Sequence, residues 1–205
     1  MIAMDAQKTL PQGYEEAGRL DLSKNKLMTV ALNVIALPAT IGFALLFLRL
    51  ASLMRAEAVP GWGELTLADG RALRFIVEMI LLSVVTVVAH ELLHAVGFRI
   101  FTGERAGFGF KGLYAYAAAP DWYLPRDEHL ATLLLPFVVI TAVGVLLLAV
   151  VPASLLTEAI LVLVLNAAGA VGDLVALVWL LTKPRSAYVN DYGDGMAVFV
   201  RSDAT

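Results

Sequence analysis

The chain contains no cysteine among its 205 residues, which excludes disulfides, thiolate metal sites and cysteine nucleophiles. Charged residues are also scarce, at 16% of the chain against about 25% in soluble domains. The net charge is only −3 and no basic block interrupts the sequence, so nucleic acid is not an expected partner. What remains is a strongly apolar chain, in which 60% of the residues are hydrophobic against about 45–50% in soluble proteins.

The apolar residues are concentrated in runs that are long enough to cross a lipid bilayer, which takes roughly 20 helical residues. We expect four membrane-spanning helices, at about residues 28–48, 73–101, 131–151 and 155–181. The sequence thus predicts an all-α membrane protein with a polar lead (1–27), a four-helix transmembrane domain (28–181) and a tail (182–205). The lead lacks the basic-then-apolar pattern of a cleaved signal, so the first span is expected to remain in the mature protein.

The distribution of lysine and arginine predicts the orientation, because cytoplasmic segments are enriched in both. With the N-terminus inside, the cytoplasmic segments hold 11 of these residues: Lys8, Arg19, Lys24, Lys26, Arg99, Arg105, Lys111, Arg126, Lys183, Arg185 and Arg201. The outer segments hold only four, namely Arg49, Arg55, Arg71 and Arg74. We therefore expect an integral protein of the cytoplasmic membrane of a bacterium or archaeon, with both termini cytoplasmic.

The second span carries the sequence His90-Glu91-Leu92-Leu93-His94, which has the H-E-x-x-H spacing of zinc metalloproteases. Residues four apart lie on one helix face about 6 Å apart along the axis, so both imidazoles can bind one Zn²⁺ ion. Glu91 lies about 100° around the helix and can act as a base without displacing either histidine. Ionisable groups this deep in a membrane cost several kcal/mol unless they are paired or ligated, although a proton path or a polar helix contact remains an alternative.

A catalytic zinc needs three protein ligands and one open position. Asp173 is the acidic residue in the interior of the fourth span, and it lies about 12 Å from the inner end, a depth that matches the histidines. We predict His90, His94 and Asp173 as the metal ligands, with His129, expected at the membrane interface, as the less favoured third ligand. The alternative is that Asp173 is an incidental acid on a small-residue packing face.

Two further segments bear on the site. Asn166, Gly169 and Asp173 share one helix face, and Gly169 and Gly172 are expected to let a neighbouring backbone come close. Asn166 is a candidate catalytic residue, as an oxyanion or substrate donor, and a helix–helix hydrogen bond is an equal alternative. Residues 106–117 alternate glycine and aromatic residues, which predicts a short β-hairpin able to bind substrate by β-addition, or an interfacial aromatic belt.

These motifs together resemble the membrane-embedded zincins of the site-two protease kind. The sequence is more similar to a bacterial and archaeal family described as putative zincin peptidases, which shares Leu10-Pro-Gln-Gly-Tyr14 and the Pro136-Phe137 that opens the third span. The resemblance implies peptide hydrolysis at zinc, with Glu91 as the base. In the larger site-two enzymes a glycine follows the aspartate, whereas here Leu174 follows Asp173, so only the aspartate carries over.

The sequence therefore predicts an intramembrane zinc endopeptidase that acts on membrane proteins or peptides. Two other classes stay open: a divalent-metal or proton carrier, and a non-catalytic metal-binding membrane protein. A carrier more often has inverted repeats and polar residues in several spans, whereas here they concentrate in two. A structural metal has no need of a base such as Glu91.

Overall fold

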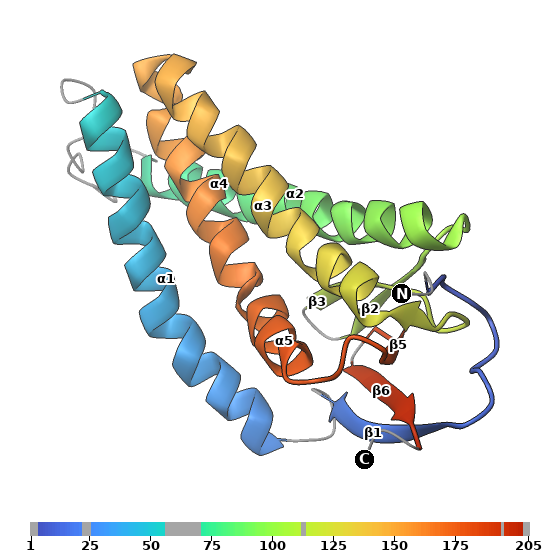
Figure 1. The fold of residues 1–205 in the computed structure, drawn as a ribbon. Coiled ribbons are helices and arrows are strands. Elements are labelled where there is room, and N and C mark those ends of the chain that lie inside the picture. The colour runs from blue at the N-terminus through green and yellow to red at the C-terminus, as the bar shows by residue number, and fades with distance from the viewer. Residues whose placement is uncertain (1–3, 22–25, 56–70, 112–113, 194, 203–205) are drawn as a thin grey trace. The chain divides into compact units, whose positions relative to one another are not determined.

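The structure, a computed structural model, describes residues 4–21, 26–55, 71–111, 114–193 and 195–202. Within these ranges the element order is β1, α1, α2, β2, β3, β4, α3, η2, α4, α5, β5 and β6 (Figure 1). The chain divides into two compact units. The first comprises residues 1–34, 91–136 and 172–205, and the second comprises residues 35–90 and 137–171.

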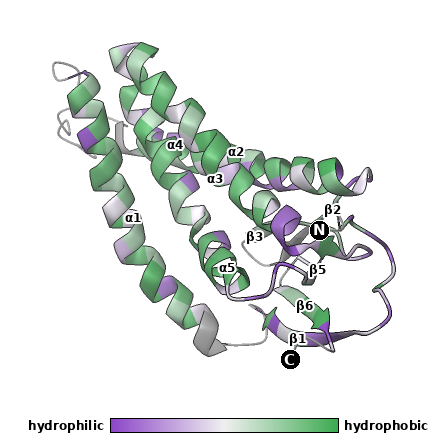
Figure 2. Ribbon diagram, in the orientation of Figure 1, coloured by the Kyte–Doolittle hydropathy of each residue, from purple (hydrophilic) through white to green (hydrophobic). Residues whose placement is uncertain are grey.

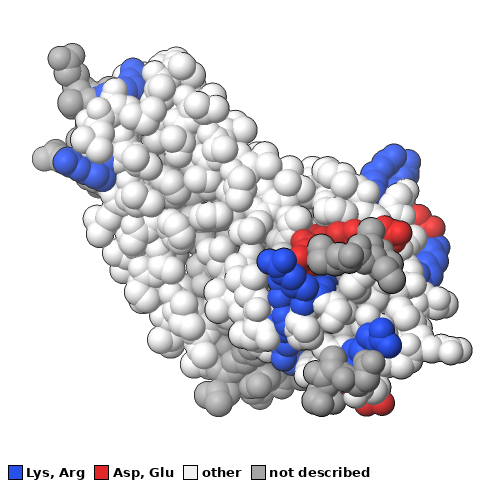
Figure 3. All heavy atoms as spheres, viewed as in Figure 1, with Lys and Arg blue, Asp and Glu red and all other residues white. Residues whose placement is uncertain are grey.

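Three helices have the length and composition of membrane spans, and they match the first three predicted spans: α1 (Lys26–Met54), α2 (Arg71–Thr102) and α3 (Arg126–Val150). Their apolar side chains are largely exposed; Leu37, Leu73 and Leu146 are 67%, 68% and 71% exposed. Figure 2 shows hydrophobic residues around most of the surface of these helices. In the view of Figure 3, charged side chains are sparse over the helices and gather near the strands. Lipid is the solvent that suits such a surface.

The fourth predicted span is a broken helix, and a bend is what its internal glycines lead us to expect. It consists of a short 3-10 turn η2 (Ala153–Leu155), α4 (Leu156–Gly169) and α5 (Val171–Leu181), with a bend of 42° between the two α-helices. The chain thus has three candidate spans, or four if the bent pair crosses as one. The break at Ala170 puts Asp173 in the first turn of α5, where the partial positive charge of a helix N-terminus favours a carboxylate.

The glycines of this segment do not have the role that the sequence suggested. A Cβ atom added to Gly169 or Gly172 would meet no atom within 4 Å among the described residues. In the second unit the close approach is at Gly144 instead, where an added Cβ would lie 2.8 Å from Cγ of Leu163. Small residues therefore bring helices together in this protein, but at other positions.

The first unit contains a four-stranded antiparallel sheet, so the protein is mostly helical but not all-α as predicted. Its order is β1-β6-β5-β4, formed by Tyr14–Asp21, Gly195–Arg201, Tyr188–Asp191 and Leu124–Pro125. The longest pairing joins the lead to the tail, with Tyr14 opposite Arg201 and Asp21 opposite Gly195. Between β5 and β6, Gly193 adopts a φ of +96°, a conformation that glycine tolerates and other residues rarely adopt.

The predicted hairpin is confirmed: β2 (Gly107–Lys111) pairs antiparallel with β3 (Tyr114–Ala118) between α2 and α3. Each unit has its own apolar core. In the first unit, residues of α3 and α5 such as Leu133 and Leu180 pack with Val189 and Val198 of the sheet. In the second unit, Phe47 of α1 packs in one cluster with Leu148 of α3 and Leu163 of α4.

Candidate metal centre

Helix α2 carries His90, Glu91 and His94, the three defining residues of the H-E-x-x-H sequence, in its C-terminal half. His90 and His94 are both 7% exposed. Because they are separated by one helical turn, they lie on the same face of the helix. His90 is the last residue of α2 that belongs to the second unit, and the continuous helix sets its place relative to His94.

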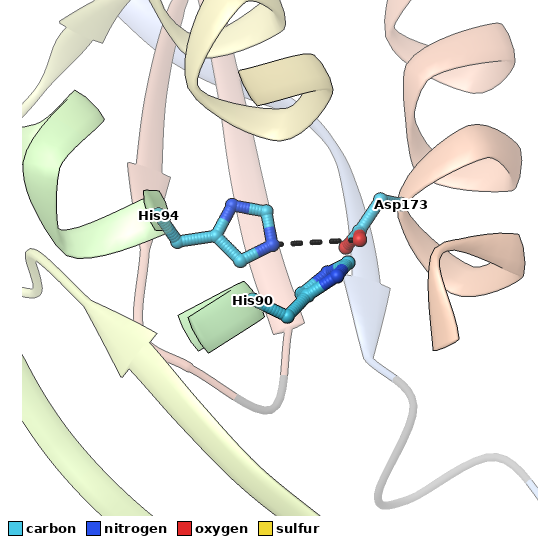
Figure 4. A group of neighbouring side chains, drawn as sticks. All are labelled: His90, His94 and Asp173. Atoms are coloured by element: carbon cyan, nitrogen blue, oxygen red, sulfur yellow. Dashed lines mark ion pairs between the residues drawn. The ribbon is translucent and has the colours of Figure 1, made fainter. Parts of the chain in front are cut away.

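Asp173 of α5 completes the group. The three residues each offer one ligand atom, and these atoms all lie within 4.8 Å of one another (Figure 4). The Nε2 atom of His94 lies 3.4 Å from Oδ2 of Asp173, the ion pair that is dashed in the figure. The structure therefore brings together all three residues that the sequence predicts as ligands.

The arrangement fits a tetrahedral zinc ion. Zinc binds imidazole nitrogen and carboxylate oxygen at about 2.0–2.2 Å, so two donors of one tetrahedron are separated by roughly 3.3–3.5 Å. The 3.4 Å between His94 Nε2 and Asp173 Oδ2 corresponds to one such separation. Two histidines and one carboxylate are also a donor set found in catalytic zinc sites, which keep a fourth position open. The Asp173 side chain is 24% exposed against 9% for His94, so the group is most open on the Asp173 side.

Both histidines are oriented by hydrogen bonds at the ring nitrogen that faces away from the group. Nδ1 of His90 lies 3.0 Å from Oδ1 of Asn166, and Nδ1 of His94 lies 3.0 Å from the backbone oxygen of Thr132. A carbonyl oxygen can only accept a hydrogen bond, so each Nδ1 carries the proton. The Nε2 atoms are then the unprotonated ones and are available to a metal, the usual pattern for ligating histidines.

Asn166 is 1% exposed, and both ends of its amide have partners. Its oxygen accepts from His90, and its nitrogen lies 3.4 Å from Oγ1 of Thr141. This arrangement favours the hydrogen-bonding alternative over the oxyanion role that the sequence left equally open. The amide oxygen of Asn166 thus orients a histidine, whereas its NH2 group has a second N–H beyond the one directed at Thr141.

Glu91 points toward the hairpin. Its Oε2 atom accepts a hydrogen bond of 2.8 Å from the backbone nitrogen of Ala117 in β3. Its charge is also close enough to act on His94. The carboxylate is thus held beside the histidines by the strand that the sequence predicted next to the site.

His129 is not part of the group and is not at an exposed interface. It is fully buried, its ring lies 6.0 Å from that of Phe98, and its Nε2 atom lies 3.5 Å from Oδ2 of Asp191 in β5. Neither ring nitrogen has a hydrogen-bond partner among the described residues. Burial raises the pKa of the Asp191 carboxyl to about 7, against the opposing hydrogen bond from the Gly193 backbone nitrogen.

Sequence reasoning missed the groups that orient the ligands. The oxygen of Thr132 and the nitrogen of Ala117 are backbone atoms, which no side-chain motif reveals. Thr141 is one threonine among apolar residues of α3, and nothing in its spacing marks it. The Thr132 oxygen could still have been found from the sequence. Pro136, four residues later, has no N–H to donate to it, so this oxygen needs another partner.

Comparison with known proteins identifies the family of the chain. A sequence model of the family described as "Putative zincin peptidase" matches residues 83–188, just over half of the chain. The matched segment contains His90, Glu91, His94, Asn166 and Asp173. No curated protein and no solved structure matches the chain. The chain belongs to the putative zincin peptidase family.

Proposed function

We propose that this protein is an intramembrane zinc metallopeptidase of the site-two protease kind, which hydrolyses peptide bonds of membrane-associated substrates. One observation carries the proposal: the candidate ligand atoms of His90, His94 and Asp173 lie within 4.8 Å of one another, and Glu91 is adjacent on the same helix. A bound metal that served only structure would not need a general base such as Glu91 beside it.

The chain would hold zinc through Nε2 of both histidines and a carboxylate oxygen of Asp173. Zinc would supply a Lewis acid that polarises the scissile carbonyl and makes water more acidic. Glu91 takes the proton from the attacking water and delivers it to the amine that leaves when the peptide bond breaks. The Ala117 backbone nitrogen orients the Glu91 carboxylate for this exchange.

The setting supports a membrane substrate. The H-E-x-x-H sequence lies within the 30-residue candidate span Leu73–Thr102, which contains an 18-residue window of mean hydropathy 2.1. A peptide that reaches His94 must therefore come from the lipid or from the headgroup region. We infer that the substrates are membrane-embedded segments that unwind locally, because a helical peptide bond is shielded by its own hydrogen bonds.

The β2–β3 hairpin offers a place for such an unwound segment. Ala117 donates to Glu91 and not to its ladder partner Phe108, so its N–H points away from β2. In an antiparallel strand, residues two apart direct their backbone groups to the same side, so Ala115 also faces that outer edge. A substrate strand that pairs with this edge would run beside Glu91, which is the β-addition mode of peptide recognition.

The experiment uses the full-length protein, purified in detergent and reconstituted into phosphatidylcholine vesicles with a mixture of single-span peptides. We expect about one zinc per chain, and cleavage that stops on chelation and returns with zinc. Cleavage products are identified by mass spectrometry. A protein that binds zinc but cleaves no peptide in the mixture, and instead moves zinc or protons across the vesicle membrane, would establish the carrier alternative.

A further inference from the structure

The hydrogen bond that orients His94 uses an unusual acceptor. Thr132 lies inside α3, where its backbone oxygen would ordinarily accept from the N–H of the residue four positions later. That residue is Pro136, which has no N–H and whose ring pushes the preceding carbonyl aside. Thr132 is 1% exposed, so water cannot readily satisfy its oxygen. The proline thus creates a buried carbonyl that needs a donor.

His94 supplies that donor. Its Nδ1 atom lies 3.0 Å from the Thr132 oxygen, a normal hydrogen-bond length. Because the oxygen can only accept, the proton is fixed on Nδ1, and Nε2 is left facing Asp173 at 3.4 Å. One missing N–H in α3 therefore decides which nitrogen of His94 is available to a metal.

The contact also requires α2 and α3 to come very close. Gly97 lies three residues after His94, on the same helix face. A Cβ atom added to Gly97 would lie 2.9 Å from Cγ2 and 3.2 Å from Cα of Thr132, which is tighter than ordinary contacts. Any larger residue would have to push the Thr132 backbone away from His94.

We propose that Pro136 and Gly97 are positioning residues for His94: the proline frees the Thr132 carbonyl, and the glycine lets His94 reach it. The inference rests on the metal-binding role of His94 in the proposed function. It deepens that function, because it explains the orientation of His94 by a proline and a glycine that do not themselves touch the metal. All four residues belong to the first unit, so the assignment does not depend on the second.

The test replaces Pro136 by alanine, which restores an N–H that competes for the Thr132 oxygen. Loss of a hydrogen bond to a metal-binding histidine typically changes metal affinity about 10–100-fold, so we expect the zinc Kd of Pro136→Ala to rise at least about 10-fold. The matched control is Pro38→Ala in α1, where the residue four positions earlier is Val34, 66% exposed. Zinc affinity is measured by competition with a chromophoric chelator, and the control should equal the wild type.

A spectroscopic measurement separates orientation from a general loss of structure. The chain has only three histidines, so ¹⁵N-histidine labelling gives a spectrum that can be assigned by substitution. In the zinc-loaded wild type, His94 should show a hydrogen-bonded Nδ1 proton with Nε2 bound to metal. In Pro136→Ala that proton signal should move upfield and exchange faster with water, while the signals of His90 stay in place.

Gly97→Ala gives an independent result if Pro136→Ala does not fold, with Gly42→Ala as its control, because a Cβ at Gly42 meets nothing within 4 Å. Wild-type zinc affinity and an unchanged His94 proton signal in either folded test variant would overturn the inference. That outcome leaves the protease proposal standing. Conversely, a protein that binds zinc tightly but never cleaves peptides would remove the proposed reaction and leave the positioning of His94 intact.

Discussion

The carboxylate of Glu91 accepts a hydrogen bond of 2.8 Å from the backbone nitrogen of Ala117, 26 residues away along the chain. This contact joins the helix of the H-E-x-x-H sequence to the hairpin that follows it. The proposed base and the proposed substrate-binding edge therefore belong to one connected arrangement, and changes to either should affect catalysis in separable ways.

Replacing Glu91 by glutamine should remove the base while preserving its shape and its contact with Ala117. General-base catalysis contributes about 10²–10⁴-fold, so cleavage should fall by at least about 100-fold at unchanged zinc content. Glu78→Gln is the control, because Glu78 lies on the same helix and pairs with Arg74 at 2.7 Å. Product formation and bound zinc are measured on the same samples. Undiminished cleavage by Glu91→Gln would exclude Glu91 as the base.

Replacing Asn166 by alanine removes the acceptor for Nδ1 of His90. Zinc affinity should fall about 10–100-fold, the range for groups that hydrogen-bond to metal ligands. Asn166→Asp keeps an oxygen acceptor and should restore most of the affinity. Asn33→Ala, in which an exposed side chain loses a bond to its own helix, is the control. If instead Asn166→Asp binds zinc normally but loses kcat, the oxyanion role would be the correct one.

Proline at position 115 tests the outer edge of β3. The N–H of Ala115 faces away from β2, so its loss should leave the hairpin ladder intact while removing one donor to an added strand. A single hydrogen bond contributes about 0.5–1.5 kcal/mol, so KM for a single-span peptide should rise about 2–10-fold at constant zinc affinity. Ala115→Val retains the N–H and should behave as wild type. Equal KM values for the two variants would rule out pairing at this edge.

Asp191 should make stability depend on pH. Burial raises its pKa to about 7 from the usual 3.8, so the folded state holds this proton more tightly than the unfolded state. The free energy of unfolding should therefore decrease as pH rises from about 4 to about 7. Asp191→Asn keeps an acceptor for Gly193 and should flatten this slope. Thermal unfolding is measured in detergent with chelator present, so that metal release does not contribute. An equally steep slope in Asp191→Asn would assign the dependence to other groups.

The sequence alone predicted those parts of the fold and of the site that a local pattern of residues determines. The spacing of His90 and His94 places both on one helix face, and the apolar run around them defines the helix. The Gly/aromatic alternation of residues 106–117 was likewise enough for the hairpin. Asp173 could be found because an acid deep in an apolar segment is rare, and its depth matched that of the histidines.

Other features depend on contacts that no local pattern encodes. The sheet pairs Tyr14 with Arg201, and a pairing between segments so far apart in the chain cannot be read from either segment alone. The glycines of the fourth predicted span predict a bend, but they do not place it at Ala170. His129 looks like an interfacial residue until β5 brings Asp191 next to it.

The pairing of β1 with β6 also constrains how the chain is threaded through a bilayer. Two strands that share a ladder must occupy the same aqueous compartment, so the segment between Asp21 and Gly195 has to cross the lipid an even number of times. Three straight helices alone would leave the strands on opposite faces. If α1, α2 and α3 all cross, the bent pair α4–α5 would have to make a fourth passage, which corresponds to counting it as one broken span.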